Sequence, residues 1–381
     1  MHIDSVDATL ETRAGRGRLQ NLAIRAPHLT VDADGGFGLR PSDPLAIEIR
    51  TNSDDVGALA NTALATKYNA SGALAMTTHV RGTRDNPDVV DDLRLTKPRY
   101  GNFTASSLFG RIEATRRAVS LSGAGINFER GRVLADATVP IRLMPFELDP
   151  GGVPVSARIT ADDLELSNFA SLLPKNSKIT GRIDGTATVA GSLNKPSLGG
   201  SMALAGGSFS SPDESIPITN TVAQVSFNHQ TVTLQEIRAS AGGGSVAGDG
   251  YAWFPNFRDP AAAAFQLSMR TTQAQFDLPK YFKGKLDANI AMSRKPGMPV
   301  LVAGSVAIAS ARIPLTALYN PKPAGSSAPQ VPPVAFDMHI GLGKDVRVVS
   351  SNVDIGATGK LDVAGTLAQP RLSGTFTSTG G

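Results

Sequence analysis

The residue types that carry most enzyme and metal chemistry are few in this sequence, and they do not cluster. The histidines are His2, His28, His79, His229 and His339, and none of them begins an H-E-x-x-H motif. Metal sites need several such ligands at short, defined spacings. The sequence has no cysteine, which excludes disulfides, thiolate metal sites and cysteine nucleophiles. We therefore expect the histidines on strand faces or in turns, and we predict no metal site and no cofactor.

Adjacent carboxylates could supply the acid and the base of a glycosidase, because that reaction uses two carboxyl groups. The adjacent carboxylates of this sequence are Asp54–Asp55, Asp91–Asp92, Asp162–Asp163 and Asp213–Glu214. All lie beside residues typical of turns or helix starts, where a carboxylate caps the backbone. The glycines at 242–244 lack the Lys-Ser/Thr of a phosphate-binding loop, and no Gly-x-Ser-x-Gly elbow occurs. We assign no catalytic residue and expect the protein not to be an enzyme.

Positive charge is spread thinly along the chain. The formal net charge is +4, from 37 Lys and Arg against 33 Asp and Glu, over 381 residues. Arg13, Arg16 and Arg18 form one basic cluster, and Arg116 and Arg117 form a smaller one. Neither cluster is interleaved with the aromatic residues on which nucleic-acid bases stack. We interpret both clusters as solvated strand faces and predict no nucleic-acid partner.

Composition indicates the elements that hold these residues. The chain has 39 glycines and 25 prolines, 18% charged, 6% aromatic and 41% hydrophobic residues. Glycine and proline are above average usage and charged residues below it, whereas the hydrophobic content is enough for a core. This balance favours many short strands separated by turns. By length alone, the chain would form two or three domains or one long repetitive one.

Alternating apolar and polar residues predict β-strands through most of the chain. A period of two leaves one face of a strand dry and the other wet. The pairs that share a face in this pattern are Val225 and Phe227, Val232 and Leu234, Val306 and Ile308, and Val346 and Val348. These eight residues are our candidates for the dry face of a sheet.

Other segments predict helix or loop. Residues 53–64, with Ser53 as N-cap candidate and two early carboxylates, predict a short helix, and residues 162–173, which stop before Pro174, predict a second. Residues 319–333 contain five prolines with glycine and serine, which predicts a surface loop. No window approaches the ~18 consecutive apolar residues of a membrane span, and no signal-peptide pattern begins the chain.

An irregular internal repeat punctuates the strands. The motif Gly-x9-Gly-x4-Pro occurs at Gly72, Gly82 and Pro87, and again at Gly181, Gly191 and Pro196. The segment from Val363 to Gly374 matches the one from Val189 to Gly200 at seven positions, and a degenerate copy begins at Gly284. We interpret each copy as a strand, a glycine turn and a proline that ends pairing before the next strand. The repeat predicts one elongated sheet in which each unit buries its face against its neighbours.

These motifs resemble the TamB family, within the AsmA-like superfamily. The resemblance rests on the short helix and repeat from Leu164 to Pro196, on Pro196 to Phe209 with the strands that follow to Gly250, and on Asp337 to Gly374. The last segment is similar to the family's C-terminal domain. The chain begins and ends inside patterned sequence, which we interpret as a fragment that reaches into that domain.

The resemblance implies an all-β fold: an elongated, twisted, U-shaped, groove-like sheet with a few short helices. It divides the chain into an AsmA-like region at 1–160, a central β-repeat region at 161–318, the loop at 319–333, and the start of the C-terminal domain at 334–381. It also implies a non-enzymatic role in the translocation and assembly module of the periplasm, in phospholipid transport between inner and outer membranes, in outer-membrane protein assembly and secretion, or in both. The implied partners are acyl chains, a BamA-like outer-membrane barrel, and the inner membrane through an anchor absent from this sequence.

Two alternatives remain at this point. The eight candidates could line an open groove for acyl chains, or they could pack against one another in a closed sandwich, because both need one dry face. The many small residues on the strands favour a groove. A different class of function, a structural or adhesive β-repeat scaffold for protein or polysaccharide, would use exposed aromatic residues, and Trp253 with Tyr251 and Phe254 is the aromatic cluster that could serve.

Overall fold

The computed structural model describes residues 2–64, 69–143, 146–148, 154–192, 195–211, 218–256, 259, 262–278, 282–314, 334–367 and 369–380. The described chain is built of strands with two short helices, which confirms the all-β prediction. It forms two compact units. Unit 1 consists of Met1–Leu172 and Ile183–Gly199, and unit 2 of Leu173–Arg182 and Gly200–Gly381.

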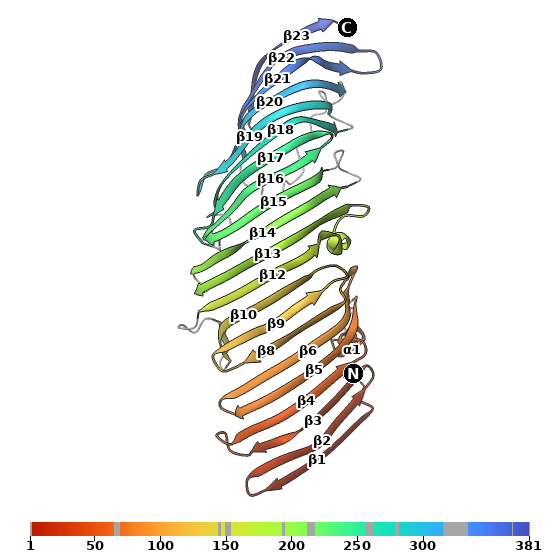
Figure 1. Cartoon of the computed structure of the whole chain (residues 1–381), viewed down its shortest axis with the longest axis vertical. Coiled ribbons are helices and arrows are strands. Elements are labelled where there is room, and N and C mark those ends of the chain that lie inside the picture. The colour runs from red at the N-terminus through yellow and green to blue at the C-terminus, as the bar shows by residue number, and fades with distance from the viewer. Residues whose placement is uncertain are drawn as a thin grey trace. The chain divides into compact units, whose positions relative to one another are not determined.

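Unit 1 is an antiparallel sheet in which strands pair with their neighbours along the chain (Figure 1). Its strands are β1 (Ser5–Arg13), β2 (Arg16–Ala26), β3 (Leu29–Gly38), β4 (Pro44–Ser53), β5 (Ala70–Thr83), β6 (Pro87–Tyr100), β7 (Phe103–Thr104), β8 (Ser107–Ala114), β9 (Ala118–Asn127), β10 (Arg132–Leu143), β11 (Phe146–Leu148) and β12 (Val155–Glu165). Helix α1 spans Val56–Leu64, and a 3-10 helix, η1, spans Leu166–Leu172. Strands β13 (Lys178–Ser192) and β14 (Lys195–Ser210) have residues in both units.

Unit 2 continues the same pattern with one exception. Its strands are β15 (Ile218–His229), β16 (Thr231–Ala241), β17 (Gly244–Trp253), β18 (Ala264–Leu278), β19 (Phe282–Arg294), β20 (Val300–Pro314), β21 (Val334–Val349), β22 (Asp354–Thr366) and β23 (Pro370–Gly380). Strands β20 and β21 are parallel, with Val300 opposite Val334, whereas the other consecutive pairs are antiparallel. The predicted proline-rich loop at 319–333 lies outside the described residues.

Strand register divides the side chains of unit 1 between two faces, because residues directly opposite each other point to the same side of a sheet. One side, which we call the apolar face of unit 1, carries Leu19, Leu22, Ile24, Val31, Phe37, Leu45, Ile47, Ile49, Leu74, Met76, Val80, Val89, Leu93, Leu95, Leu108, Ile112, Leu121, Ile126, Val133 and Val139. The other, the polar face of unit 1, carries Asp32, Glu48, Arg50, His79, Arg81, Asp92, Arg94, Arg111, Arg132 and Asp162.

Unit 2 shows the same division. Its apolar face carries Val225, Phe227, Val232, Leu234, Ile237, Val246, Phe265, Leu267, Ile290, Met292, Val302, Val306, Ile308, Phe336, Met338, Ile340, Leu342, Val346, Val348, Leu361 and Val363. Its polar face carries Gln224, Arg238, Asp249, Arg270, Lys283, Lys285, Asn289, Arg312, Asp337, His339, Arg347, Lys360 and Asp362.

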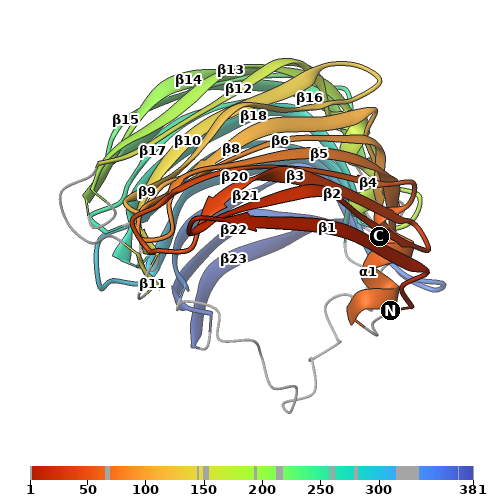
Figure 2. The same ribbon diagram turned by 90° about the horizontal axis from the view of Figure 1, so that it is seen from below.

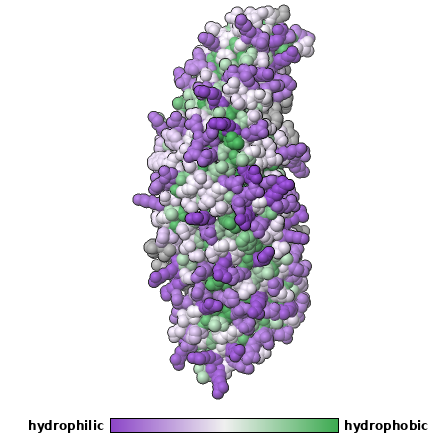
Figure 3. Space-filling view, viewed as in Figure 1, coloured by the Kyte–Doolittle hydropathy of each residue, from purple (hydrophilic) through white to green (hydrophobic). Residues whose placement is uncertain are grey.

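The strands are bowed within each unit (Figure 2), and the burial of its side chains assigns the apolar face to the inner side of the bend. The most buried side chains of unit 2 are on this face, including Ala274 and Val346 at 0% and Ala311 at 3% exposure. Side chains on the inner side of a bend converge and shield one another, which accounts for this burial. Figure 3 looks onto the outer side, where hydrophilic residues predominate with some hydrophobic residues between them.

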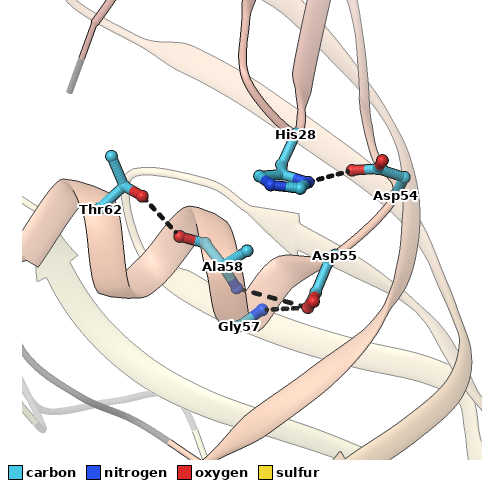
Figure 4. Close-up of polar contacts among 6 residues, drawn as sticks. All are labelled: His28, Asp54, Asp55, Gly57, Ala58 and Thr62. Atoms are coloured by element: carbon cyan, nitrogen blue, oxygen red, sulfur yellow. Dashed lines mark hydrogen bonds and ion pairs between the residues drawn. The ribbon is translucent and has the colours of Figure 1, made fainter.

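Helix α1 forms where the sequence predicts a helix at 53–64, but its N-cap is Asp55 and not Ser53. The Asp55 Oδ1 atom accepts hydrogen bonds from the backbone N–H groups of Gly57 (2.9 Å) and Ala58 (3.3 Å), as Figure 4 shows. Ser53 is buried at the end of β4, and its hydroxyl has no hydrogen-bond partner. Asp54 instead lies 2.9 Å from Nδ1 of His28, which occupies the turn after β2.

The second predicted helix, at 162–173, is wrong in its first turn. Strand β12 runs to Glu165, and only Leu166–Leu172 is helical, as the 3-10 helix η1. Cross-strand pairing accounts for the difference, because Asp162 lies opposite Arg132 of β10 and accepts hydrogen bonds from its guanidinium at 2.6 and 2.9 Å. The helix η1 places Phe169 against Phe103 and Phe128, with ring centroids 5.6 to 6.1 Å apart.

The predicted capping role of the carboxylate pairs is also wrong in two cases. Asp91 and Asp92 lie inside strand β6, where they point to opposite faces of unit 1. The pair Asp162–Asp163 lies inside β12. Asp213–Glu214 falls outside the described residues. Strand pleating therefore separates the carboxylates of Asp91 and Asp92.

The repeat motif is a hairpin, and its proline starts the next strand. Gly82 lies directly opposite Pro87, and Gly365 lies directly opposite Pro370, so pairing continues through the proline. Gly82 has φ +87° and Gly365 has φ +89°. A Cβ atom at Gly365 would also lie 2.5 Å from the carbonyl oxygen of Gln369. The glycine of the motif therefore supplies the space and the positive φ that this tight turn needs.

We predict that Gly365→Ala destabilises unit 2, because the alanine would hold an unfavourable φ and clash with the turn. The free energy of unfolding should fall by about 1–3 kcal/mol. Urea titration followed by the fluorescence of Trp253, the only tryptophan, measures it.

Gly341→Ala is the matched control, because a Cβ atom there meets nothing within 4 Å. Its effect should stay within about 0.5 kcal/mol. Equal effects of the two substitutions would contradict the turn argument.

Candidate functional site

The eight residues predicted to share a dry face all lie on the apolar face of unit 2. Val225 and Phe227 belong to β15, Val232 and Leu234 to β16, Val306 and Ile308 to β20, and Val346 and Val348 to β21. The register brings Phe227 opposite Val232 and Val225 opposite Leu234. Seven of the eight are half-buried, and Val346 is fully buried. Val346 thus contributes packing within the face, and the other seven keep exposed surface.

The sequence analysis missed much of this face. Strand β21 adds Phe336, Met338, Ile340 and Leu342 to it. Their strict alternation was a usable signal, because every second residue from 336 to 342 is apolar and large. Met292 is harder to assign from sequence, because its strand β19 mixes small and polar residues.

The apolar face of unit 2 is not covered by a second layer in the part of the chain that the structure describes. Each strand from β15 to β23 contacts its neighbours in the sheet, and no described helix packs on these strands. A sandwich would require a second sheet facing the first at about 10 Å. The described structure therefore favours an open apolar surface over a closed sandwich core.

Charged side chains are nearly absent from the two apolar faces. In unit 1, Asp91 is on the apolar face and accepts a hydrogen bond of 2.5 Å from the hydroxyl of Thr78. In unit 2, Arg294 lies over the ring of Phe265, with its guanidinium carbon 5.6 Å from the ring centroid. The Nε atom of Arg294 donates to the carbonyl of Ala263 at 2.8 Å. Both charges are thus satisfied locally, and the faces stay apolar.

The polar faces carry cross-strand ion pairs. In unit 1, the Arg111 guanidinium donates to both carboxylate oxygens of Asp92 at 2.8 and 2.9 Å, and these hydrogen bonds lower the pKa of Asp92. In unit 2, His339 Nδ1 lies 2.6 Å from Asp362 Oδ1, and this hydrogen bond, helped by the charge of Asp337, raises the pKa of His339. Exposed ion pairs of this kind contribute little to the free energy of unfolding. Their main effect is to make this face of the sheet hydrophilic.

Aspartates of the repeat hold backbone irregularities in place. Gln273 of β18 has φ +52°, and its backbone N–H donates to Asp287 Oδ1 of β19 at 2.5 Å. The backbone N–H of Asp163, at φ +52°, donates to Asp184 Oδ1 of β13 at 2.8 Å. Asp184 and Asp287 both end a Gly-basic-apolar-Asp segment, and Asp362 occupies the same place in a third copy.

The bulge beside Gln273 bends strand β18. The register of β18 against β19 shifts between Thr271 and Ala274, which marks one extra residue on β18. A bulge increases the local bend and twist of its strand. The carboxylate of Asp287 satisfies the N–H that the bulge removes from the ladder. The aspartate of the repeat therefore stabilises a bend in the neighbouring strand, whereas its glycine and proline form the turn.

The described residues form no metal centre. No group of three or more His, Asp or Glu side chains there could hold a metal ion. The histidines lie where the sequence predicts, with His28 and His229 at strand ends and His79 and His339 on strand faces.

These observations define a class of protein whose sheet is one layer thick, with an apolar inner face and a charged outer face. Residues 233–381 match the family model of the TamB C-terminal domain. This match covers the C-terminal part of the chain and supports membership of the TamB family, which the glycine and proline motifs also resemble. No curated protein and no solved structure matches the chain.

The match to the TamB C-terminal domain supports a TamB-type role in the translocation and assembly module. TamB proteins are non-enzymatic components of transport and assembly, and the family is periplasmic and associated with the cell envelope. Within the described residues, no helix has the length and apolar character needed to cross a membrane.

We predict that Asp287→Ala destabilises unit 2 by about 1–2 kcal/mol, because the N–H of Gln273 loses its acceptor. Trp253 fluorescence during urea unfolding measures the change. Asp249→Ala is the control, since Asp249 is an exposed carboxylate on the polar face of the same unit. If Asp249→Ala is as costly as Asp287→Ala, the aspartate does not act through the bulge.

We predict that the His339–Asp362 pair stabilises unit 2 at low pH only. The folded-state pKa of His339 is raised above 6.5, so its contribution is full below that pH and is lost as pH rises through the folded pKa. The difference in urea midpoint between the wild type and His339→Gln should therefore be larger at pH 5 than at pH 8.5. A difference independent of pH would show that the ion pair is not its source.

Proposed function

We propose that the chain binds the acyl chains of phospholipids on its apolar faces and thereby moves phospholipids between the inner and outer membranes. The observation that carries this proposal is the apolar face of unit 2, which is continuous from β15 to β22 and is not covered by a second layer of described residues. A monomeric soluble protein rarely exposes such a surface unless something binds to it.

The energetics suit a transport surface. Each methylene of an acyl chain buried against an apolar surface contributes about 0.8 kcal/mol. Small residues such as Gly304 and Ala288 lie directly opposite larger ones, Ile290 and Val306, on this face. Lipid would be held by total area and not by a specific headgroup contact, so it could exchange along the face.

The same proposal includes the setting of the protein. By family, we propose anchorage of the full-length protein in the inner membrane and an outer-membrane partner of the BamA-like barrel type. The apolar faces could also receive the apolar strands of an outer-membrane protein during its assembly. An extended acyl chain fits a one-layer apolar surface without needing strand pairing, and for this reason we favour lipid.

A scaffold for protein or polysaccharide is the competing function. The aromatic residues that would serve it, Tyr251 and Trp253, lie on the polar side of β17 at 48% and 39% exposure. These two aromatic side chains point to the opposite side of the sheet from the apolar face. Probes placed on the two faces can therefore distinguish the two functions.

We predict that photo-crosslinkers at Phe227 and Ile308 capture phospholipid when the chain is expressed in a double-membraned bacterium. Both positions keep exposed surface on the apolar face. Mass spectrometry of the crosslinked protein identifies the adducts, and native mass spectrometry of the purified chain tests for retained lipid.

Crosslinkers at Ser226 and Ala307 are the controls, because these neighbours lie on the opposite side of the same strands. They should capture little lipid. Protein adducts at all four positions without lipid would favour the scaffold, and equal lipid capture at all four would remove the role of the apolar face.

A further inference from the structure

Three cations lie directly beside one another on the polar face of unit 2. Lys283 of β19 is opposite Arg312 of β20, and Arg312 is opposite Arg347 of β21. Lys285 lies two residues along β19, opposite Ser310. The three strands come from separate parts of the sequence, so the sheet alone brings these residues together.

Like charges directly opposite each other destabilise a sheet. From β15 to β23, no other registered pair places two cations opposite each other. Two registered pairs of this unit place opposite charges across from each other, His339 with Asp362 and Lys283 with Asp277, and other charges, such as Arg270, face neutral residues. The row from Lys283 to Arg347 is therefore an electrostatic exception within this unit.

Arg312 is the unbalanced member of the row. The flanking cations have carboxylates, since Lys283 Nζ is 2.6 Å from Asp277 Oδ2 and Arg347 Nε is 2.5 Å from Asp354 Oδ1. Among the described residues, no carboxylate pairs with exposed Arg312. Its guanidinium is free to donate several hydrogen bonds in a planar fork.

A cavity of about 540 Å³ opens beside this row. Its lining residues are Gln275, Lys283, Gly284, Lys285, Ser310, Ala311, Arg312, Asp345 and Arg347. Four are cations and one, Asp345, is an anion. The register of β20 against β21 shifts between Ile308 and Ser310, so the cavity lies where the strands are irregular. Gly284 and Ala311 also line the cavity, although their side-chain positions point to the apolar face.

We propose that this cavity binds a phosphate group, with Arg312 as its principal ligand and Lys283, Lys285 and Arg347 around it. Phosphate fits because its oxygens accept the parallel hydrogen bonds that a guanidinium donates and because its charge relieves the repulsion along the row. The phosphate could belong to an anionic phospholipid headgroup at a membrane surface or to a small soluble molecule. The site is on the opposite side from the apolar face and does not depend on acyl-chain binding there.

The test measures phosphate binding to the full chain in two forms. Titration calorimetry with inorganic pyrophosphate measures a soluble phosphate, and cosedimentation with phosphatidylcholine vesicles, with and without phosphatidylglycerol, measures a headgroup. Binding in either form supports the site, and which form binds identifies the source. Arg312→Gln should weaken that binding about tenfold, as expected for a lost charge-assisted contact. Lys285→Gln should weaken it in the same direction.

Arg270→Gln is the matched control, because Arg270 is an exposed cation on the same face, opposite Asn289 and outside the cavity. It should change the affinity less than twofold. Circular dichroism verifies that each variant keeps its strands. The proposal is overturned if the wild type binds neither probe, or if Arg270→Gln weakens binding as much as Arg312→Gln, which would reduce the effect to net charge.

Discussion

The backbone hydrogen-bond ladder is the constraint on which the rest of this structure depends. Each unit is one layer thick in its described part, so strands are held chiefly by their two neighbours and not by a second sheet. Because side chains alternate with a period of two, a slip of one residue in any pair would exchange the apolar and polar faces from there on. The turns of the repeat and the aspartates beside the bulges fix that register. Gly365 opposite Pro370 sets where a strand re-enters, and Asp287 holds the extra residue at Gln273.

Register in turn separates two kinds of chemistry. The apolar face gathers aliphatic and aromatic residues from most strands of a unit, and its rare charges, such as Arg294 over Phe265, have local partners. The polar face carries cross-strand ion pairs together with His79 and His339. The separation leaves the charged side chains together on the surface opposite the apolar face. It also makes the two sides independent: acyl chains on one side and a phosphate group on the other would be bound by different residues of the same strands.

The sequence predicted strands and their faces correctly where the signal, such as alternation of apolar and polar residues, lies within one short segment. Alternation placed Val225, Phe227, Val232 and Leu234 on one face, and the structure has them opposite one another. Patterns failed where a distant partner decided the outcome. The segment after Asp162 has the composition of a helix start, yet Arg132 of a neighbouring strand holds it extended to Glu165. The carboxylates at Asp91 and Asp92 read as a pair in sequence, but the pleat sends them to opposite sides.

The sequence by itself determined the fold class, the resemblance to the TamB family and eight residues of the apolar face of unit 2, because all three depend on short-range order: alternation of period two, glycine and proline at fixed spacing, and segments similar to the TamB C-terminal domain. Only the tertiary structure decided which residues of different strands lie opposite each other. Lys283, Arg312 and Arg347 are about thirty or more residues apart in the chain and have no local signature, yet parallel and antiparallel pairing of three strands aligns them. The open state of the apolar face is likewise a tertiary property, since alternation is the same for a groove and for a closed core.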